Sequence, residues 1–91
     1  MIRNPNFIKR RIGTRDVIVA VGEEARRFGG MLSVNKTGGV IWDLLEKETD
    51  LEQLTGALVA RYEIDRDTAK KDAEDFLAAL RGVGALVERG N

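Results

Sequence analysis

The side chains of this sequence that could do chemistry are carboxylates, amines, guanidinium groups and a single serine, Ser33. The chain has no His and no Cys, which removes the usual zinc ligands, the thiol nucleophile and the histidine base of a serine triad. Nothing near Ser33 in the sequence is suited to activate it. The acidic residues are spaced as on the solvent-facing side of helices, so they do not predict a paired acid and base. We therefore expect a protein that is not an enzyme, with no catalytic residue, metal or cofactor.

Binding motifs for nucleotides are also missing. Neither a G-x-x-x-x-G-K-[ST] loop nor a G-x-G-x-x-G fingerprint occurs.

The 91 residues suffice for one modest hydrophobic core, so residues 1–91 are predicted to form a single domain. No apolar run approaches the ~18 residues of a membrane span, and the N-terminus lacks a signal-peptide apolar region. A soluble, cytoplasmic protein that does not contact membranes is the expectation.

The N-terminal third has the period of β-strands. Residues 7–12 and 16–21 are short runs of β-type composition joined by a turn-like connection, which predicts two neighbouring strands. A third strand is expected within residues 26–34. Gly29 and Gly30 there indicate either a bulge in that strand or the tip of a second hairpin. The three segments predict a small antiparallel sheet.

From Asn35 onward the period is helical. Asn35 is a plausible N-cap for a helix over about 36–47. Thr49 and Glu52 match a capping box, which predicts that a second helix begins there. A third helix is expected after a short turn near residue 64.

The boundaries of the third helix are predicted from cap residues. Asp65 or Asp67 can cap its start, and Gly82 or Gly84 can end it. The tail after it, residues 85–89, has the composition of a short extended segment.

Gly38 and Gly39 stand in the first turns of the first predicted helix, although Gly costs roughly 1 kcal/mol relative to Ala in a helix. We interpret them as a close approach between this helix and a strand, with Trp42 filling the space beyond. Trp42 is predicted to be a core residue. The fold class is therefore α+β, a winged helix-turn-helix-like domain with a three-stranded antiparallel sheet followed by three helices.

Several motifs occur along the chain in a characteristic order. They are Arg10-Arg11-Ile12-Gly13, Val17-Ile18-Val19, Val34-Asn35-Lys36-Thr37-Gly38-Gly39-Val40-Ile41-Trp42, Thr49-Asp50-Leu51-Glu52-Gln53-Leu54, Tyr62 and Asp72-Ala73-Glu74-Asp75-Phe76-Leu77-Ala78-Ala79-Leu80. In this order and spacing the chain resembles the PqqD-like family, named for the pyrroloquinoline quinone synthesis protein D. Val34 stands where the family usually has Leu, and Ala73 where a larger aliphatic residue is common.

The resemblance implies a function. PqqD-like proteins bind the leader of a ribosomally made precursor peptide as an added strand beside their third strand, next to their third helix. They then present the precursor to a modifying enzyme, often a radical S-adenosylmethionine protein. This implies peptide chaperone activity in the biosynthesis of a modified peptide or a cofactor.

The residue pattern offers candidates for such a site. The strand near residues 31–34 has little charge and no Pro to blunt its edge, and Ala69 and Ala73 at i and i+4 predict a shallow trough. The same alanines would equally suit close helix packing, and Phe76 by itself is more typical of a core residue. The predicted peptide-binding residues are Phe28, Met31, Leu32, Ser33, Val34, Ala69, Lys70, Asp72, Ala73 and Phe76.

The alternative is a winged-helix DNA-binding regulator, because the second and third helices would form a helix-turn-helix. Residues 1–45 carry a net charge of +4 and residues 46–91 one of −4. The third helix, which would read DNA, has Lys70 and Lys71 among four acidic residues, whereas phosphate contacts require a basic surface. We therefore expect no nucleic-acid partner. The free strand edge is compatible with a monomer or a weak homodimer.

Overall fold

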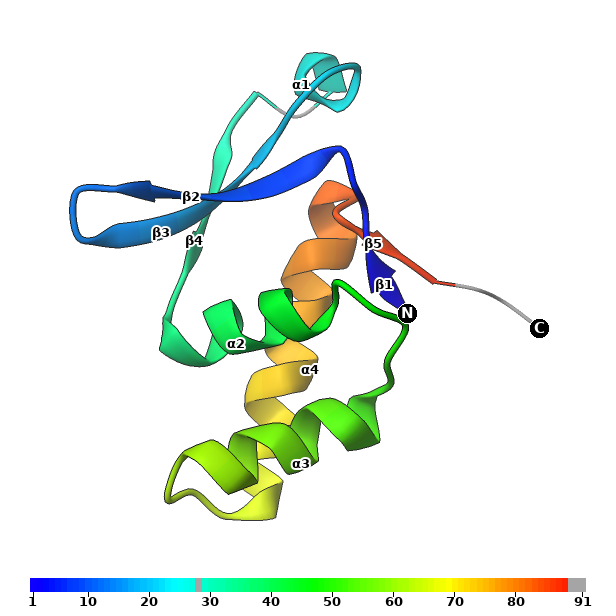
Figure 1. Cartoon of the computed structure of the whole chain (residues 1–91). Helices are drawn as coiled ribbons and strands as arrows, with labels where there is room; N and C mark the ends of the chain where they lie inside the picture. The colour runs from blue at the N-terminus through cyan, green and yellow to red at the C-terminus, as the bar shows by residue number, and fades with distance from the viewer. Residues whose placement is uncertain (28, 89–91) are drawn as a thin grey trace.

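The computed structural model describes residues 1–27 and 29–88. Its main sheet is antiparallel with the strand order β2-β3-β4 (Figure 1). The strands are β2 (Phe7–Ile12), β3 (Arg15–Ala20) and β4 (Met31–Val34). The predicted three-stranded antiparallel sheet is confirmed. Phe28 lies outside the described residues.

The connection between β3 and β4 differs from the prediction. It contains a short helix, α1 (Glu24–Arg27), which the sequence pattern did not reveal. Gly29 and Gly30 precede β4 and lie outside its paired residues, so they do not form a bulge in a strand. They do not form the tip of a tight hairpin either, because α1 lies within the same connection.

Three longer helices follow the sheet, as predicted. They are α2 (Lys36–Leu44), α3 (Leu51–Arg61) and α4 (Arg66–Val83). Asn35 caps α2, since its side-chain oxygen accepts a hydrogen bond from the Gly38 amide at 2.8 Å. Helix α2 ends at Leu44, three residues earlier than expected, and residues 45–47 form a turn.

The capping box at the start of α3 was predicted one residue too early. The N-cap is Asp50, whose carboxylate accepts from the Gln53 amide at 2.8 Å. The Gln53 side chain in turn accepts from the Asp50 amide, and it also accepts from the Thr49 hydroxyl. Thr49 therefore supports the box from outside and does not form it with Glu52.

Helix α4 begins at the first of its two predicted caps. Asp65 accepts a hydrogen bond from the Thr68 amide at 2.7 Å, and this bond lowers the pKa of the Asp65 carboxyl below its ordinary value. The cap is therefore complete at neutral pH and weakens as acid protonates Asp65. Gly84 ends the helix with φ of +82°, a left-handed conformation that glycine adopts without a steric penalty.

The two ends of the chain pair with each other, which the sequence did not predict for the N-terminus. Strand β1 (Ile2–Arg3) is antiparallel to β5 (Leu86–Val87), which lies in the extended tail expected after α4. Figure 1 shows this pair beside the end of α4, apart from the main sheet.

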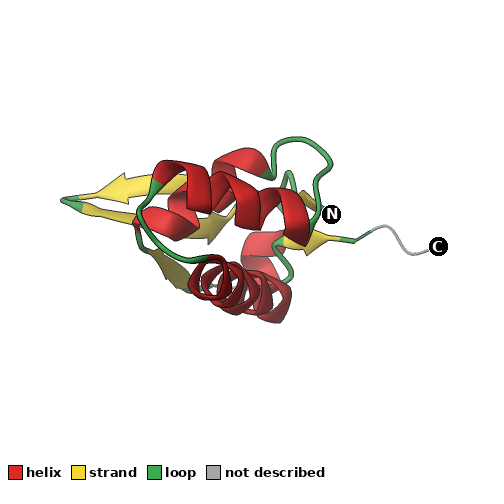
Figure 2. Ribbon diagram, turned by 90° about the horizontal axis from the view of Figure 1, so that it is seen from below, coloured by secondary structure: helices red, strands yellow, loops and turns green. Residues whose placement is uncertain are grey.

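The core lies between the inner face of the sheet and the three longer helices. Trp42 is 2% exposed, which confirms its predicted core position, and the Arg3 guanidinium stands 5.3 Å from the centre of its ring. Figure 2 shows the helices gathered together, with the β2–β3 hairpin extending away from them. No helix in the described ranges is long and apolar enough to cross a membrane.

Candidate functional site

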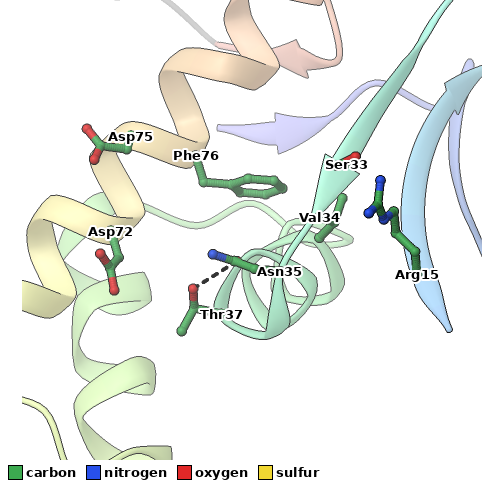
Figure 3. Close-up of a pocket in the computed structure, with 8 residues that line it drawn as sticks. All are labelled: Arg15, Ser33, Val34, Asn35, Thr37, Asp72, Asp75 and Phe76. Carbon is green, nitrogen blue, oxygen red and sulfur yellow. Dashed lines mark hydrogen bonds between the residues drawn. The ribbon is translucent and has the colours of Figure 1, made fainter.

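A hollow of about 570 Å³ lies between β4 and α4 (Figure 3). Its wall on the helix side comes from α4, and its opposite wall comes from β4, the start of α2 and the start of β3. The lining residues are Arg15, Ser33, Val34, Asn35, Thr37, Asp72, Asp75 and Phe76. We call this hollow the groove.

The strand that borders the groove is at the edge of the sheet. β4 pairs with β3 on one side, and in residues 1–27 and 29–88 no other strand pairs with it. An edge strand presents backbone N–H and C=O groups that can bond a further strand. The edge of β4 carries neither proline nor a charged residue that would oppose such pairing. The groove therefore combines an available strand edge with a facing helix.

Phe76 forms the apolar wall of the groove. Its ring projects from α4 toward Val34, as Figure 3 shows, and it is partly buried against the core. A Cβ atom at Gly38 would lie 3.0 Å from Cε1 of this ring and 3.1 Å from the Asn35 side-chain oxygen. Gly38 thus makes room for Phe76 and for the cap of α2.

This corrects the interpretation of the two glycines. The close neighbour of Gly38 is an aromatic ring on α4, and not the backbone of a strand. At Gly39 a Cβ atom would be 3.8 Å from Lys9 Nζ and 4.0 Å from Val34 Cγ1, both ordinary contact distances. Only Gly38 meets a close steric constraint.

The charges of the groove are distributed between its two walls. Asp72 and Asp75 line it from α4, and Arg15 lines it from β3 (Figure 3). Lys71, one turn before Asp75, donates to the Asp75 carboxylate at 2.8 Å, and this bond raises the pKa of Lys71. Because Asp75 is paired with Lys71, Asp72 is the carboxylate that a ligand can neutralise. A ligand that fits these charges has a basic group toward Asp72 and an acidic group toward Arg15.

The predicted site residues fall into two groups. Ser33, Val34, Asp72 and Phe76 line the groove together. Five other predicted residues do not line the groove, namely Met31, Leu32, Ala69, Lys70 and Ala73. The remaining one, Phe28, is outside the described residues.

The expected trough at Ala69 and Ala73 is wrong. Both side chains are 0% exposed and belong to the hydrophobic core, so their small size serves close packing. Lys70 is exposed and lines a separate hollow between α3 and α4. Leu32 points to the core side of the sheet, and Met31 is exposed on the opposite face.

Four residues of the groove were not among the predicted site residues, namely Arg15, Asn35, Thr37 and Asp75. Asn35 was interpreted only as a cap, yet the cap places it at the groove, where its side-chain oxygen also accepts from the Thr37 hydroxyl at 3.1 Å (Figure 3). Arg15 precedes the predicted second strand. No sequence pattern brings it near α4, because only the pairing of β3 with β4 does so.

The fold and the groove define a class of protein. It is a small α+β domain with a helix-turn-helix pair and an open groove at the edge of its sheet. The chain belongs to the PqqD family, because the family profile described as "Coenzyme PQQ synthesis protein D (PqqD)" matches residues 15–86. The membership predicted from the sequence motifs is confirmed. No curated protein is similar enough to this chain to count as a match.

Two solved structures share the fold. One, described as "TbiB1 in Complex with the TbiA(beta) Leader Peptide", has a TM-score of 0.75 and 26% identity, and the similarity covers 100% of both chains. The other, described as "Lasso peptide synthetase B1 complexed with the leader peptide", has a TM-score of 0.72 over 94% of this chain and 95% of that chain. At 19% identity, this second structure supports the fold alone.

Proposed function

We propose that this protein binds the leader of a ribosomally synthesised precursor peptide as an added strand on β4, and presents the precursor to a modifying enzyme. The observation that carries the proposal is the groove, in which the unpaired edge of β4 lies opposite Phe76 and Asp72 of α4. Membership of the PqqD family and the leader peptide named in the more similar solved structure support it.

The groove supplies both components of strand addition. Main-chain hydrogen bonds along β4 give affinity that does not depend on sequence, and alternate side chains give selectivity. A peptide residue opposite Val34 would face the Phe76 ring, which favours an apolar side chain there. A basic residue beside it would meet Asp72.

The proposal extends to the partners. Following the family resemblance, we expect the modifying enzyme to be a radical S-adenosylmethionine protein, and we expect the chain to act in the cytoplasm as a monomer or a weak homodimer. The DNA-binding alternative has no support from the family match or from the structural neighbours. The acidic face of α4 also opposes it, because that helix would have to approach phosphates.

Selection from a displayed library of random 12-residue peptides tests the proposal. We expect the immobilised protein to enrich peptides that combine apolar residues with a Lys or Arg. Calorimetry with an enriched peptide should give a binding stoichiometry of one peptide per protein chain. Added salt should weaken binding, because part of the recognition is between charges. Enrichment no greater than on a surface without protein, or a ratio incompatible with one site, would contradict peptide binding.

A further inference from the structure

The outer face of the sheet, which points away from the core, carries apolar side chains next to the groove. Pairing of the strands places Ile8, Val19 and Met31 in one row across this face, and Arg10, Val17 and Ser33 in the next. Met31 is 60% exposed, and Ile12 at the end of β2 is 49% exposed. These are the two most exposed large apolar side chains among the described residues.

A second hollow, of about 470 Å³, lies on this outer face. Its lining residues are Ile12, Gly13, Thr14, Arg15, Val17, Met31 and Ser33. Val17 is 2% exposed although it is not part of the main core, so neighbouring residues of the outer face cover it. Arg15 and Ser33 line both this outer hollow and the groove, and the two therefore meet at β4.

We infer that the outer hollow is a second subsite for the same bound peptide and takes one of its aliphatic or aromatic side chains. The inference rests on the proposed strand addition to β4. Successive side chains of a strand point to opposite faces of the sheet. If the peptide residue opposite Val34 faces Phe76, the neighbouring residue opposite Ser33 must face the outer hollow.

The dimensions and the chemistry of this subsite suit an apolar side chain. Directly opposed residues of antiparallel strands have Cβ atoms roughly 4.5–5.5 Å apart, so a large side chain opposite Ser33 reaches past that small residue. There it meets Met31, whose exposed surface it would cover. A peptide that contacts both the groove and the outer hollow needs apolar residues at adjacent positions. A peptide that contacts the groove alone needs them only at alternate positions.

Substitution of Met31 tests the subsite, with peptides obtained by selection on the unaltered protein as the probes. Met31→Asp and Met31→Lys should each weaken peptide binding about tenfold, since both replace apolar contact with a charge. Equal losses for opposite charges identify the lost apolar contact as the cause. Val59→Asp is the matched control, because Val59 is also an exposed apolar residue but lies on α3. It should leave the affinity unchanged.

The peptide side completes the test. Replacing the outward apolar residue of the peptide with Asp should weaken binding to the unaltered protein about tenfold, but should add little to the loss in Met31→Asp. Ile12→Asp, at a second exposed position of the hollow, should show a loss in the same direction even if Met31→Asp proves unstable.

The outcomes separate this subsite from the proposed function. If the unaltered protein binds selected peptides while the Met31 and Ile12 variants bind them equally well, the outer subsite is wrong and strand addition stands. If the unaltered protein binds no peptide, the proposed function fails and the subsite fails with it.

Discussion

Replacing Trp42 with Ala should lower the free energy of unfolding by about 3–5 kcal/mol, as truncation of a large aromatic side chain in a core does. Trp42 is 2% exposed and lies within the buried cluster formed by α2, α3, α4 and the inner face of the sheet. The Arg3 guanidinium stacks over its ring and donates to the Trp42 carbonyl at 3.1 Å. Loss of the ring therefore leaves a cavity and also removes its contact with the Arg3 guanidinium, whereas the hydrogen bond to the Trp42 carbonyl remains.

Denaturant unfolding followed by circular dichroism measures this loss. Val59→Ala is the control, because Val59 is an exposed side chain on α3 and its truncation should change stability by no more than about 0.5 kcal/mol. A Trp42→Ala protein that unfolds at the same denaturant concentration as the parent would show that Trp42 is not a core residue.

Replacing Phe76 with Ala should weaken peptide binding about 30- to 100-fold, equivalent to roughly 2–3 kcal/mol. Phe76 is the largest apolar side chain among the residues that line the groove, and its ring lies between the core and the first turn of α2. An aromatic residue that is fixed before binding loses little conformational entropy when the ligand arrives. Its truncation therefore removes contact area and also opens a gap in the wall of the groove.

Val83→Ala is the matched control for Phe76→Ala. Val83 is also a partly buried apolar residue of α4 that packs against the core, but it lies at the end of the helix, about two turns from Phe76. Calorimetry with a selected peptide, at a temperature where both variants are folded, should show a large loss only for Phe76→Ala. Equal affinities of the two variants would remove Phe76 from the site.

The sequence predicted the elements of this fold from their periods, and it failed where two local patterns compete. The segment from Thr49 to Gln53 contains two overlapping capping boxes, one beginning at Thr49 and the other at Asp50. Both have a suitable acceptor followed three residues later by Glu or Gln. The structure uses Asp50, and the local pattern alone does not distinguish the two starts.

The sequence predicted the two elements that border the candidate site, a strand and a helix. It predicted only some of the side chains that line it. Periodicity identifies small residues on α4, yet it does not say which side of the helix faces the sheet edge. Ala69 and Ala73 lie on the core side, whereas Asp72 and Phe76 lie on the side that borders β4. That distinction depends on how α4 crosses the sheet, which no local pattern encodes.

Interpretation of Gly38 shows the same limit. A glycine in a helix indicates that something lies close to it, and the sequence favoured a strand because one directly precedes the helix. The neighbour is the ring of Phe76, 38 positions further along the chain. Contacts between such distant residues follow from the tertiary packing.

Hydrogen exchange at the backbone amides of β4, with and without a bound peptide, tests strand addition most directly. An added strand forms hydrogen bonds with backbone amides at the edge of β4. Exchange within residues 31–35 should therefore slow when a selected peptide binds, and exchange near residues 72–76 of α4 should slow as well. Slowed exchange confined to β2 or α3, with residues 31–35 unchanged, would contradict the account.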